Sequence, residues 1–495
     1  MSSATVIWII VVYFGILILV SFLTGRDDSN AAFFIGKKES PWYVVAFGMI
    51  GASLSGVTFI SVPGWVATSQ FSYMQMVLGY LAGYLVIGLV LMPLYYKLNL
   101  TSIYGYLEQR FGFWSYKTGA FYFLLSRVIG ASFRLFLVAI SLHIAVFEQM
   151  GLPFWIAVLV AVCLIWVYTF KSGIKTIIWT DTLQTAAMLL AVGVTIYTIK
   201  DSMGWNFSDM TAAVGDSGYA QWFFWDDWNS DRHFVKQFLA GMFITIAMTG
   251  LDQDMMQKNL SCKSIGEAQK NMFWFSIVLV VANVLFLSMG AMLFLFRDAI
   301  GFDPAATADK LFPGLALSGE LGTVAGVLFV VGLVAAAYSS ADSALTALTT
   351  SFCVDFLGME KKPKTSDKTT RKLVHIGFTA LLFVVIVIFE AINDQSVISG
   401  LFKVAGYTYG PLLGLYAFGM FTKRQVIDRF VPALCVIAPL LSYVLQANSE
   451  AWFGGYKIGF ELLLINGMLT FSGLYLLSLS STAQSPPLLD DLESV

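Results

Sequence analysis

Apolar runs of about 20 residues recur along this chain, and each is long enough to cross the hydrocarbon of a lipid bilayer as one helix. Hydrophobic residues make up 58% of the 495 residues and charged residues only 12%, against about 25% charged in an ordinary soluble domain. The sequence therefore predicts an all-α polytopic protein of the lipid bilayer. We expect about 13 transmembrane helices, near 5–24, 42–68, 73–96, 117–147, 153–171, 176–199, 233–257, 271–297, 319–352, 372–391, 396–420, 426–446 and 456–479.

Composition and motifs argue against several other functions. The net charge of −2 gives no basic surface for nucleic acid. The histidines, His143, His233 and His375, form no metal-binding or triad arrangement, and HExxH, GxSxG and P-loop motifs are missing. We therefore do not expect an enzyme. The 4 cysteines have neither metal-ligand nor disulfide spacing and are interpreted as reduced thiols. No obligate protein partner is evident.

Lysine and arginine are unequally divided among the loops. Roughly 20 lie in one set of alternate loops and about 6 in the other, which predicts an outside N-terminus and a cytoplasmic C-terminus in a plasma (inner) membrane. Lys258 is counted with the cytoplasmic loops, whereas Arg127, Arg134 and Lys403 fall within predicted spans. The first apolar run lacks a basic n-region and a cleavage site, so it is interpreted as a retained helix.

Three polar segments lie between or beyond the spans. Residues 200–232, with "WFFWDDWNSDR", are interpreted as an interfacial aromatic belt or extracellular cap, with a binding site as the alternative. The basic linker "GMEKKPKTSDKTTRK" (358–372) is expected to fix the topology, and contact with anionic lipid is the second interpretation. We expect a disordered tail at 481–495.

The second span contains "GMIGASLSGVTFISVPG" (48–64), in which small and polar residues and Pro63 cluster. Proline removes a backbone donor and glycine lowers the cost of leaving helical geometry. Such residues also serve close packing between helices. We favour a broken helix, which a membrane tolerates only where protein or a water-filled cavity surrounds it.

The span near 319–352 contains "SSADSALTALTTS" (339–351). Helical spacing places Ser339, Asp342, Ser343 and Thr346 on one face, with Ser340 beside them. Serines can bond back to their own helix, but that does not explain a carboxylate at membrane depth. A stripe of oxygen donors alone suits a hard cation such as Na⁺.

Two further charged residues lie within or at the edge of predicted spans. Asp181, in "GIKTIIWTDTLQ" (173–184), is either an interfacial acid near a helix start or a functional carboxylate. Arg134 needs an anionic partner or access to water. It is interpreted either as a clamp for a substrate carboxylate or as half of an internal salt bridge with Glu108, Glu148 or Asp342.

Five segments taken together resemble the sodium:solute symporter family. They are "GVTFISVPG" (56–64), "TSIYGYLEQRFG" (101–112), "GIKTIIWTDTLQ" (173–184), "DQDMMQKNLSCKSIGEAQK" (252–270) and "AAAYSSADSALTALTTSFCVDF" (335–356). They occur in the family's order, and the resemblance runs from about residue 5 to about residue 480.

The resemblance implies a LeuT-type core of two inverted five-helix repeats. The chain would then divide into an N-terminal extra helix and loop (1–41), a first repeat (42–199), an extracellular loop (200–232), a second repeat (233–420), two C-terminal helices (421–480) and the tail (481–495).

The family also implies Na⁺ as the coupling ion, at one conserved site and, in some members, a second. The conserved site maps onto Gly51, Leu54, Ala336, Ser339 and Ser340. The second maps onto Asp181, Ser339, Asp342 and Ser343. Asp342 stands where such members usually have serine; two carboxylates could hold Na⁺ more firmly or share a proton, and we favour sodium.

Within the family, the chain resembles the bacterial sialic acid symporters. Their substrate-contacting hydroxyls match Ser53, Ser55 and Thr58, and their carboxylate-binding arginine matches Arg134. A glutamine they carry is not preserved, because Gly79 falls at that position and Gln75 lies one turn away as a possible substitute. The monocarboxylate and iodide branch is also similar around "WTDTLQ" and "YLEQRF".

These features predict a Na⁺-coupled secondary active symporter that imports a small organic solute, a carboxylate such as sialic acid, by alternating access. The alternatives are a symporter of a neutral sugar, an amino acid or a monocarboxylate, a proton-coupled carrier, and a sensor that binds solute without transporting it.

Overall fold

The computed structural model describes residues 3–24, 29–169, 174–303, 308–359, 367–392 and 397–479. The predicted tail at 481–495 lies outside these ranges. So do the loop cations Arg26 and Lys171 and residues 360–366 of the basic linker.

Within these ranges the chain forms helices joined by turns and by a longer connection at 217–233, and an isolated β-bridge pairs Ser40 with Cys262. The helices of the first half are α1 (Ser3–Thr24), α2 (Asn30–Ile35), α3 (Trp42–Ser53), α4 (Val62–Ser69), α5 (Tyr73–Val86), α6 (Met92–Lys97), α7 (Gly105–Arg110), α8 (Phe113–Leu142), α9 (Phe154–Thr169), α10 (Ile174–Ser202) and α11 (Phe207–Asp216). Those of the second half are α12 (Phe234–Thr245), α13 (Gln253–Leu260), α14 (Ile265–Ile300), α15 (Ala308–Ser318), α16 (Gly322–Ser351), α17 (Asp367–Ile392), α18 (Val397–Thr408), α19 (Gly410–Phe421), α20 (Val431–Ala447), α21 (Ser449–Trp452) and α22 (Leu462–Leu479).

Most of the predicted spans are long apolar helices. Among the described residues, 9 helices are long and apolar enough to cross a membrane, or up to 11 if each of two bent pairs is one span. Two shorter apolar helices, Phe154–Val167 and Gly410–Phe421, lie where the spans 153–171 and 396–420 were expected. The all-helical membrane fold is confirmed, and the exact number of spans stays a prediction.

The break expected in the second span is present. α3 ends at Ser53, the chain leaves the helix at Leu54 (φ −80°, ψ 74°), and it resumes as a π-helical turn (Val57–Ser61) that runs into α4. The two halves meet at an angle of 60°. Pro63 lies in the first turn of α4, where a missing backbone N–H costs least.

A second broken helix was not predicted. The span expected at 233–257 consists of two helices that meet at 64°, α12 with its π-helical end and α13. Asp252 is the reason, because its backbone is extended and its carboxylate caps the first N–H groups of α13. The hydroxyls of Tyr95 and Tyr104 donate to the last two carbonyls before the break, at 2.8 and 2.9 Å.

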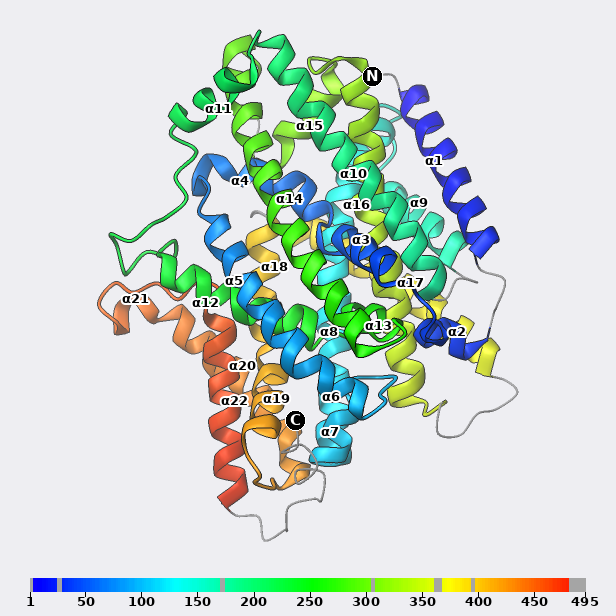
Figure 1. Ribbon diagram of the computed structural model, residues 1–495, viewed down its shortest axis with the longest axis vertical. Coiled ribbons are helices and arrows are strands. Elements are labelled where there is room, and N and C mark those ends of the chain that lie inside the picture. The colour runs from blue at the N-terminus through cyan, green and yellow to red at the C-terminus, as the bar shows by residue number, and fades with distance from the viewer. Residues whose placement is uncertain are drawn as a thin grey trace.

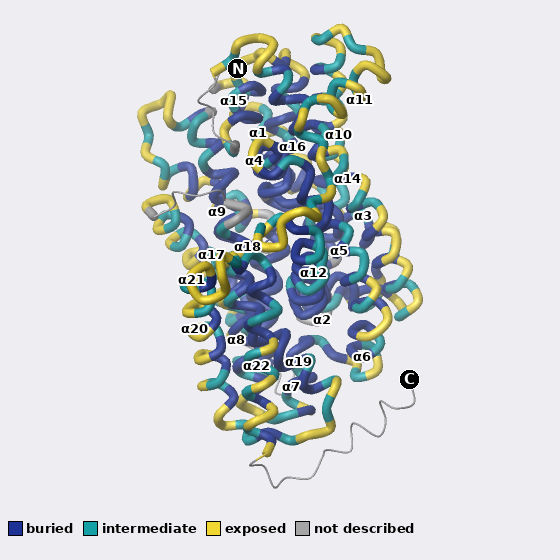
Figure 2. The backbone as a smooth tube through the Cα atoms, turned by 90° about the vertical axis from the view of Figure 1, so that its left-hand side faces the viewer, coloured by how far each residue is buried: buried dark blue, intermediate teal, exposed yellow. Residues whose placement is uncertain are grey.

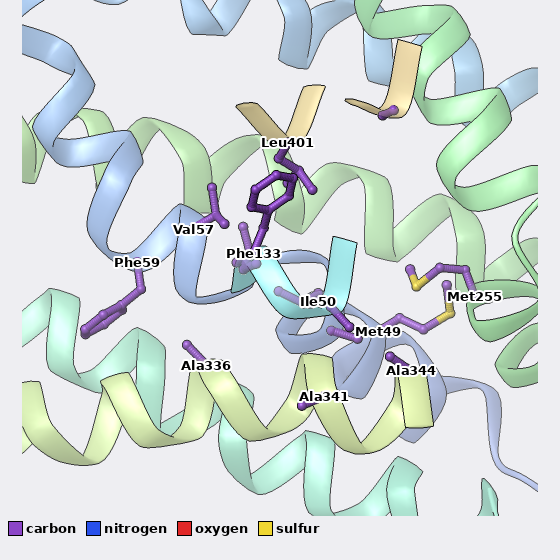
Figure 3. Packing of buried hydrophobic residues seen from close by; sticks show 14 of the residues in the cluster. Met49, Ile50, Val57, Phe59, Phe133, Met255, Ala336, Ala341, Ala344 and Leu401 are labelled. Carbon is purple, nitrogen blue, oxygen red and sulfur yellow. The ribbon is translucent and has the colours of Figure 1, made fainter. Parts of the chain in front are cut away.

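One half of each broken helix, α3 in the first and α13 in the second, packs against the long helix α16 (Figure 1). α10 packs along α16, and α3 packs onto α10. In Figure 3, Met49 and Ile50 of α3 lie beside Ala341 and Ala344 of α16. The break at the end of α3 therefore lies a few residues beyond a tightly packed region. Figure 2 shows buried residues concentrated along these helices and exposed residues at the periphery.

The outer helices and the long connecting segment surround this core. α1 and α22 lie on opposite sides of the molecule in Figure 1. In the segment 200–232, α11 begins with a capping box, and Trp225 and Trp228 further along are exposed. Exposed aromatic side chains suit a membrane interface, and the belt or cap remains a prediction.

α5 and α12 cross with their backbones almost in contact. A Cβ atom on Gly241 would lie 2.2 Å from the carbonyl oxygen of Met76, and one on Gly79 would lie 2.1 Å from that of Phe238. Residues without a side chain permit such an approach between helices. The packing also explains the glycine at 79, because no glutamine side chain fits between these two backbones.

We predict that Gly241→Ala destabilises the fold by about 1–3 kcal/mol, because the atom it meets is backbone and the helices must move apart. The free energy of unfolding can be measured by SDS titration of the purified protein. Gly193→Ala is the matched control, since Gly193 lies within α10 with no heavy atom within 4 Å of an added Cβ. Equal stability of the two variants would contradict the close crossing.

Candidate functional site

A cavity of about 90 Å³ lies where the two broken helices face each other. Its walls come from six parts of the chain: Ala52, Ser53, Leu54, Ser55, Val57 and Thr58 at the first break; Tyr73, Tyr80 and Tyr84 on α5; Arg127 and Arg134 on α8; Ile244, Thr245, Met248, Thr249 and Met255 around the second break; Leu279 and Asn283 on α14; and Leu401 and Phe402 on α18. The cavity therefore contains the predicted residues Ser53, Ser55, Thr58 and Arg134.

The two arginines in the cavity wall differ in their partners. Arg127 forms ion pairs with Asp254 and, at 3.8 Å, with Asp252. Asp252 also accepts a hydrogen bond from the hydroxyl of Tyr409 at 2.6 Å. Arg134, in contrast, forms no ion pair with any residue that the structure describes, and its buried Nε has no hydrogen-bond partner. The internal salt bridge, the alternative interpretation of Arg134, is not formed among the described residues.

Gln75 lies away from the cavity. Its Nε2 donates to the carbonyl of Arg232 at 2.9 Å, and its Oε1 accepts from the backbone N–H of Phe224 at 3.1 Å. Both ends of the amide thus hold the segment 200–232 against α5. The sequence position of Gln75 indicated a contact with substrate. In the structure, Gln75 instead holds two parts of the chain together.

The residues expected at the first sodium site come together at the end of α3. A Cβ on Gly51 would lie 3.3 Å from Oγ of Ser339, and Oγ of Ser340 donates to the carbonyl of Ala52 at 3.5 Å. Ala336 precedes both serines by one turn of α16.

Carbonyls of the last helical turn lack intrahelical partners, and the helix dipole is negative there. Carbonyls and hydroxyls are oxygen donors of the type that Na⁺ accepts, so the set fits the ion.

At the second expected sodium site, a lysine side chain lies next to the predicted residues. The sequence had indicated that this lysine belongs to a loop. Lys258 lies on α13 with its side chain 1% exposed, and its Nζ donates to Oδ2 of Asp181 at 2.7 Å. Oδ1 of Asp181 accepts from Oγ of Ser339 at 2.8 Å. Counting Lys258 as a cytoplasmic loop cation was wrong, because it is half of a buried ion pair.

Asp342 is joined to this pair through Ser343. The backbone N–H of Ser343 donates to Oδ1 of Asp342 at 2.5 Å, and its hydroxyl lies 3.4 Å from Oδ2 of Asp181. Asp342 and Asp181 are both fully buried. The structure thus brings all four predicted residues together, but around an ammonium group, so the set does not fit a sodium ion that uses both oxygens of Asp181.

Several groups at the site were missed from the sequence. Asn283 on α14 lines the cavity, and its Oδ1 is buried without a hydrogen-bond partner. The hydroxyls of Tyr73 and Tyr80 bond to each other at 3.1 Å. Thr185 Oγ1 donates to the carbonyls of Asp181 and Phe47, at 2.8 and 3.0 Å. Only Asn283, as a polar residue within a span, carried a local signal that could have marked it.

The sodium:solute symporter family matches residues 33–427 of the chain. The chain belongs to this family. It is 25% identical over 477 residues to the sodium/sialic acid symporter NanT of Aliivibrio fischeri, covering 92% of this chain and 91% of that protein. It is 24% identical over 447 residues to the sodium/sialic acid symporter SiaT of Proteus mirabilis, covering 86% and 87%.

A solved structure of a Na⁺-coupled sialic acid symporter, substrate-bound and outward-open, superposes with a TM-score of 0.81 at 20% identity, covering 97% of this chain and 99% of that one. This similarity confirms the LeuT-type fold. Because the family consists of sodium:solute symporters and not of enzymes, the protein is a multi-pass membrane symporter that couples solute to Na⁺.

We predict that Asp181→Asn and Lys258→Met each destabilise the symporter by about 3–5 kcal/mol, because each leaves one buried charge without its partner. The double variant should lose clearly less than the sum of the two single losses. Unfolding by choline dodecyl sulfate in sodium-free choline buffer measures all three. Additive losses would show that the two side chains do not interact.

Proposed function

We propose that this symporter imports a small organic carboxylate together with Na⁺, and that Arg134 binds the carboxylate. One observation carries the proposal: a guanidinium in the cavity wall without an ion-pair partner among the described residues. A charge at this depth is costly unless it is paired or hydrated. A carboxylate can accept two parallel hydrogen bonds from the planar guanidinium group, and so supplies the missing charge.

The hydroxyls around the cavity favour a substrate that also carries polar groups. Ser53, Ser55 and Thr58 lie on the wall formed by the first break. Two relatives named as sialic acid symporters support sialic acid as the first substrate to test. The cavity of about 90 Å³ is smaller than the roughly 300–1,000 Å³ of common ligand pockets. A sialic acid would require its walls to separate, whereas a short monocarboxylate would not.

For the coupling ion, we propose the set formed by the carbonyls of Gly51, Leu54 and Ala336 and the hydroxyls of Ser339 and Ser340. Leu54 also lines the cavity, so the ion and the solute would bind next to each other. Sodium at this set would hold the end of α3 against α16. One Na⁺ and one carboxylate together carry no net charge across the membrane, so the Na⁺ concentration gradient, and not the membrane potential, would drive their import.

Alternating access is the transport cycle we propose, with the divisions 42–199 and 233–420 as inverted repeats. The two broken helices support it, since each begins one of these segments and both face the cavity. The unequal distribution of lysine and arginine supports a plasma membrane orientation with the N-terminus outside and the C-terminus in the cytoplasm.

We predict that Arg134→Ala weakens carboxylate transport by about 10- to 100-fold in apparent affinity, since a hydrogen bond to a charged group contributes about 1.5–3 kcal/mol. Uptake driven by an inward Na⁺ gradient into proteoliposomes measures this, with sialic acid, lactate, a neutral sugar and a neutral amino acid as solutes. Arg297→Ala is the control, because Arg297 lies at the end of α14 and pairs with exposed Asp298.

A result that overturns the substrate proposal is accumulation of the sugar or the amino acid with the same affinity in both variants. Uptake driven equally well by a proton gradient without sodium would instead indicate the proton-coupled alternative.

We predict that Ser340→Ala lowers the apparent affinity for Na⁺ by about 10-fold, the equivalent of about 1.4 kcal/mol for one lost oxygen ligand. The dependence of solute uptake on Na⁺ concentration measures it. Thr323→Ala is the control, since Thr323 is exposed in the first turn of the same helix. An unchanged Na⁺ dependence in Ser340→Ala would place the ion elsewhere.

A further inference from the structure

We propose that Lys258 is a built-in cation of the Asp181 site, so that the symporter binds one sodium ion, at the set around Gly51 and Ser340, and not two. This rests on the sodium set proposed above. It assigns to Lys258 a role in the number of ions carried, which the resemblance to two-sodium members of the family did not indicate.

Geometry is the first support for the proposal. The Lys258 Nζ atom lies 2.7 Å from Oδ2 of Asp181, and Ser339 Oγ lies 2.8 Å from Oδ1. An ammonium at hydrogen-bond distance occupies the space in which a sodium ion would use the same oxygen. Its positive charge also cancels the attraction that would hold a second cation there.

A shared ligand is the second support. Lys258, Asp181 and Ser339 form one continuous hydrogen-bonded chain. Ser339 also belongs to the adjoining sodium set, because its hydroxyl donates to Asp181 and keeps its lone pairs for the ion. The Lys258–Asp181 pair therefore positions a ligand of the one sodium ion instead of binding a second.

The position of Lys258 connects the pair to the helices of the proposed sodium set. Lys258 lies on α13, the half-helix beyond the second break, whereas Asp181 lies on α10. α13 packs against α3 and α16, the helices that provide the proposed sodium ligands. The pair therefore ties α13 to α10 directly beside those ligands.

The test counts bound sodium directly. Equilibrium binding of ²²Na⁺ to purified protein in choline buffer gives the number of ions per chain without any transport. We expect one ion for the wild type, two for Lys258→Met and one for Asp181→Asn/Lys258→Met, in which both charges are removed. Lys258→Arg keeps the positive charge and should bind one ion.

Two ions on the wild type, or one ion on folded Lys258→Met, would overturn the proposal. Size-exclusion chromatography identifies folded variants, and Lys258→Gln replaces Lys258→Met if that variant aggregates. Ser340→Ala separates the two proposals: if it keeps wild-type sodium affinity while Lys258→Met still gains an ion, the Gly51–Ser340 assignment fails and the role of Lys258 stands.

Discussion

A helix that breaks inside a membrane must satisfy its freed backbone groups within the protein, and the rest of this structure follows from that constraint. At the first break, Ser340 reaches the carbonyl of Ala52. At the second break, the hydroxyls of Tyr95 and Tyr104 donate hydrogen bonds to the last two carbonyls before it, and Asp252 caps the next helix. Both breaks therefore lie among polar side chains, and the cavity and the oxygen-rich set next to it are formed there.

The buried charges around this region divide into matched and unmatched groups. Arg127 is matched by Asp254 and Asp252, and Asp181 is matched by Lys258. Arg134 has no such partner among the described residues, which is why the substrate is proposed to supply one. Since breaking a buried pair costs far more than a surface pair contributes, the matched charges hold the half-helices in place and the unmatched one remains for binding.

Sequence patterns located the first break, the oxygen donors of α16 and the arginine of the cavity because each has a local signature. Small residues and a proline inside an apolar run mark a break, and a charge in such a run marks a site. The second break was missed because "TGLDQD" contains one glycine and no proline, and Asp252 breaks the helix through a capping bond that only the folded backbone shows. Gln75 was placed at the site by its spacing, but its amide holds the segment 200–232.

The sequence by itself determined the class of protein, because hydropathy, periodicity and the positions of serine and aspartate are properties of short segments. The tertiary structure alone decided which charges meet. Lys258 is 77 residues from Asp181, and its neighbours in sequence indicate a polar loop. In the fold, the chain turns at Asp252, and Lys258 on α13 is buried next to Asp181. Pairing over such distances depends on how half-helices pack, and no local pattern encodes it.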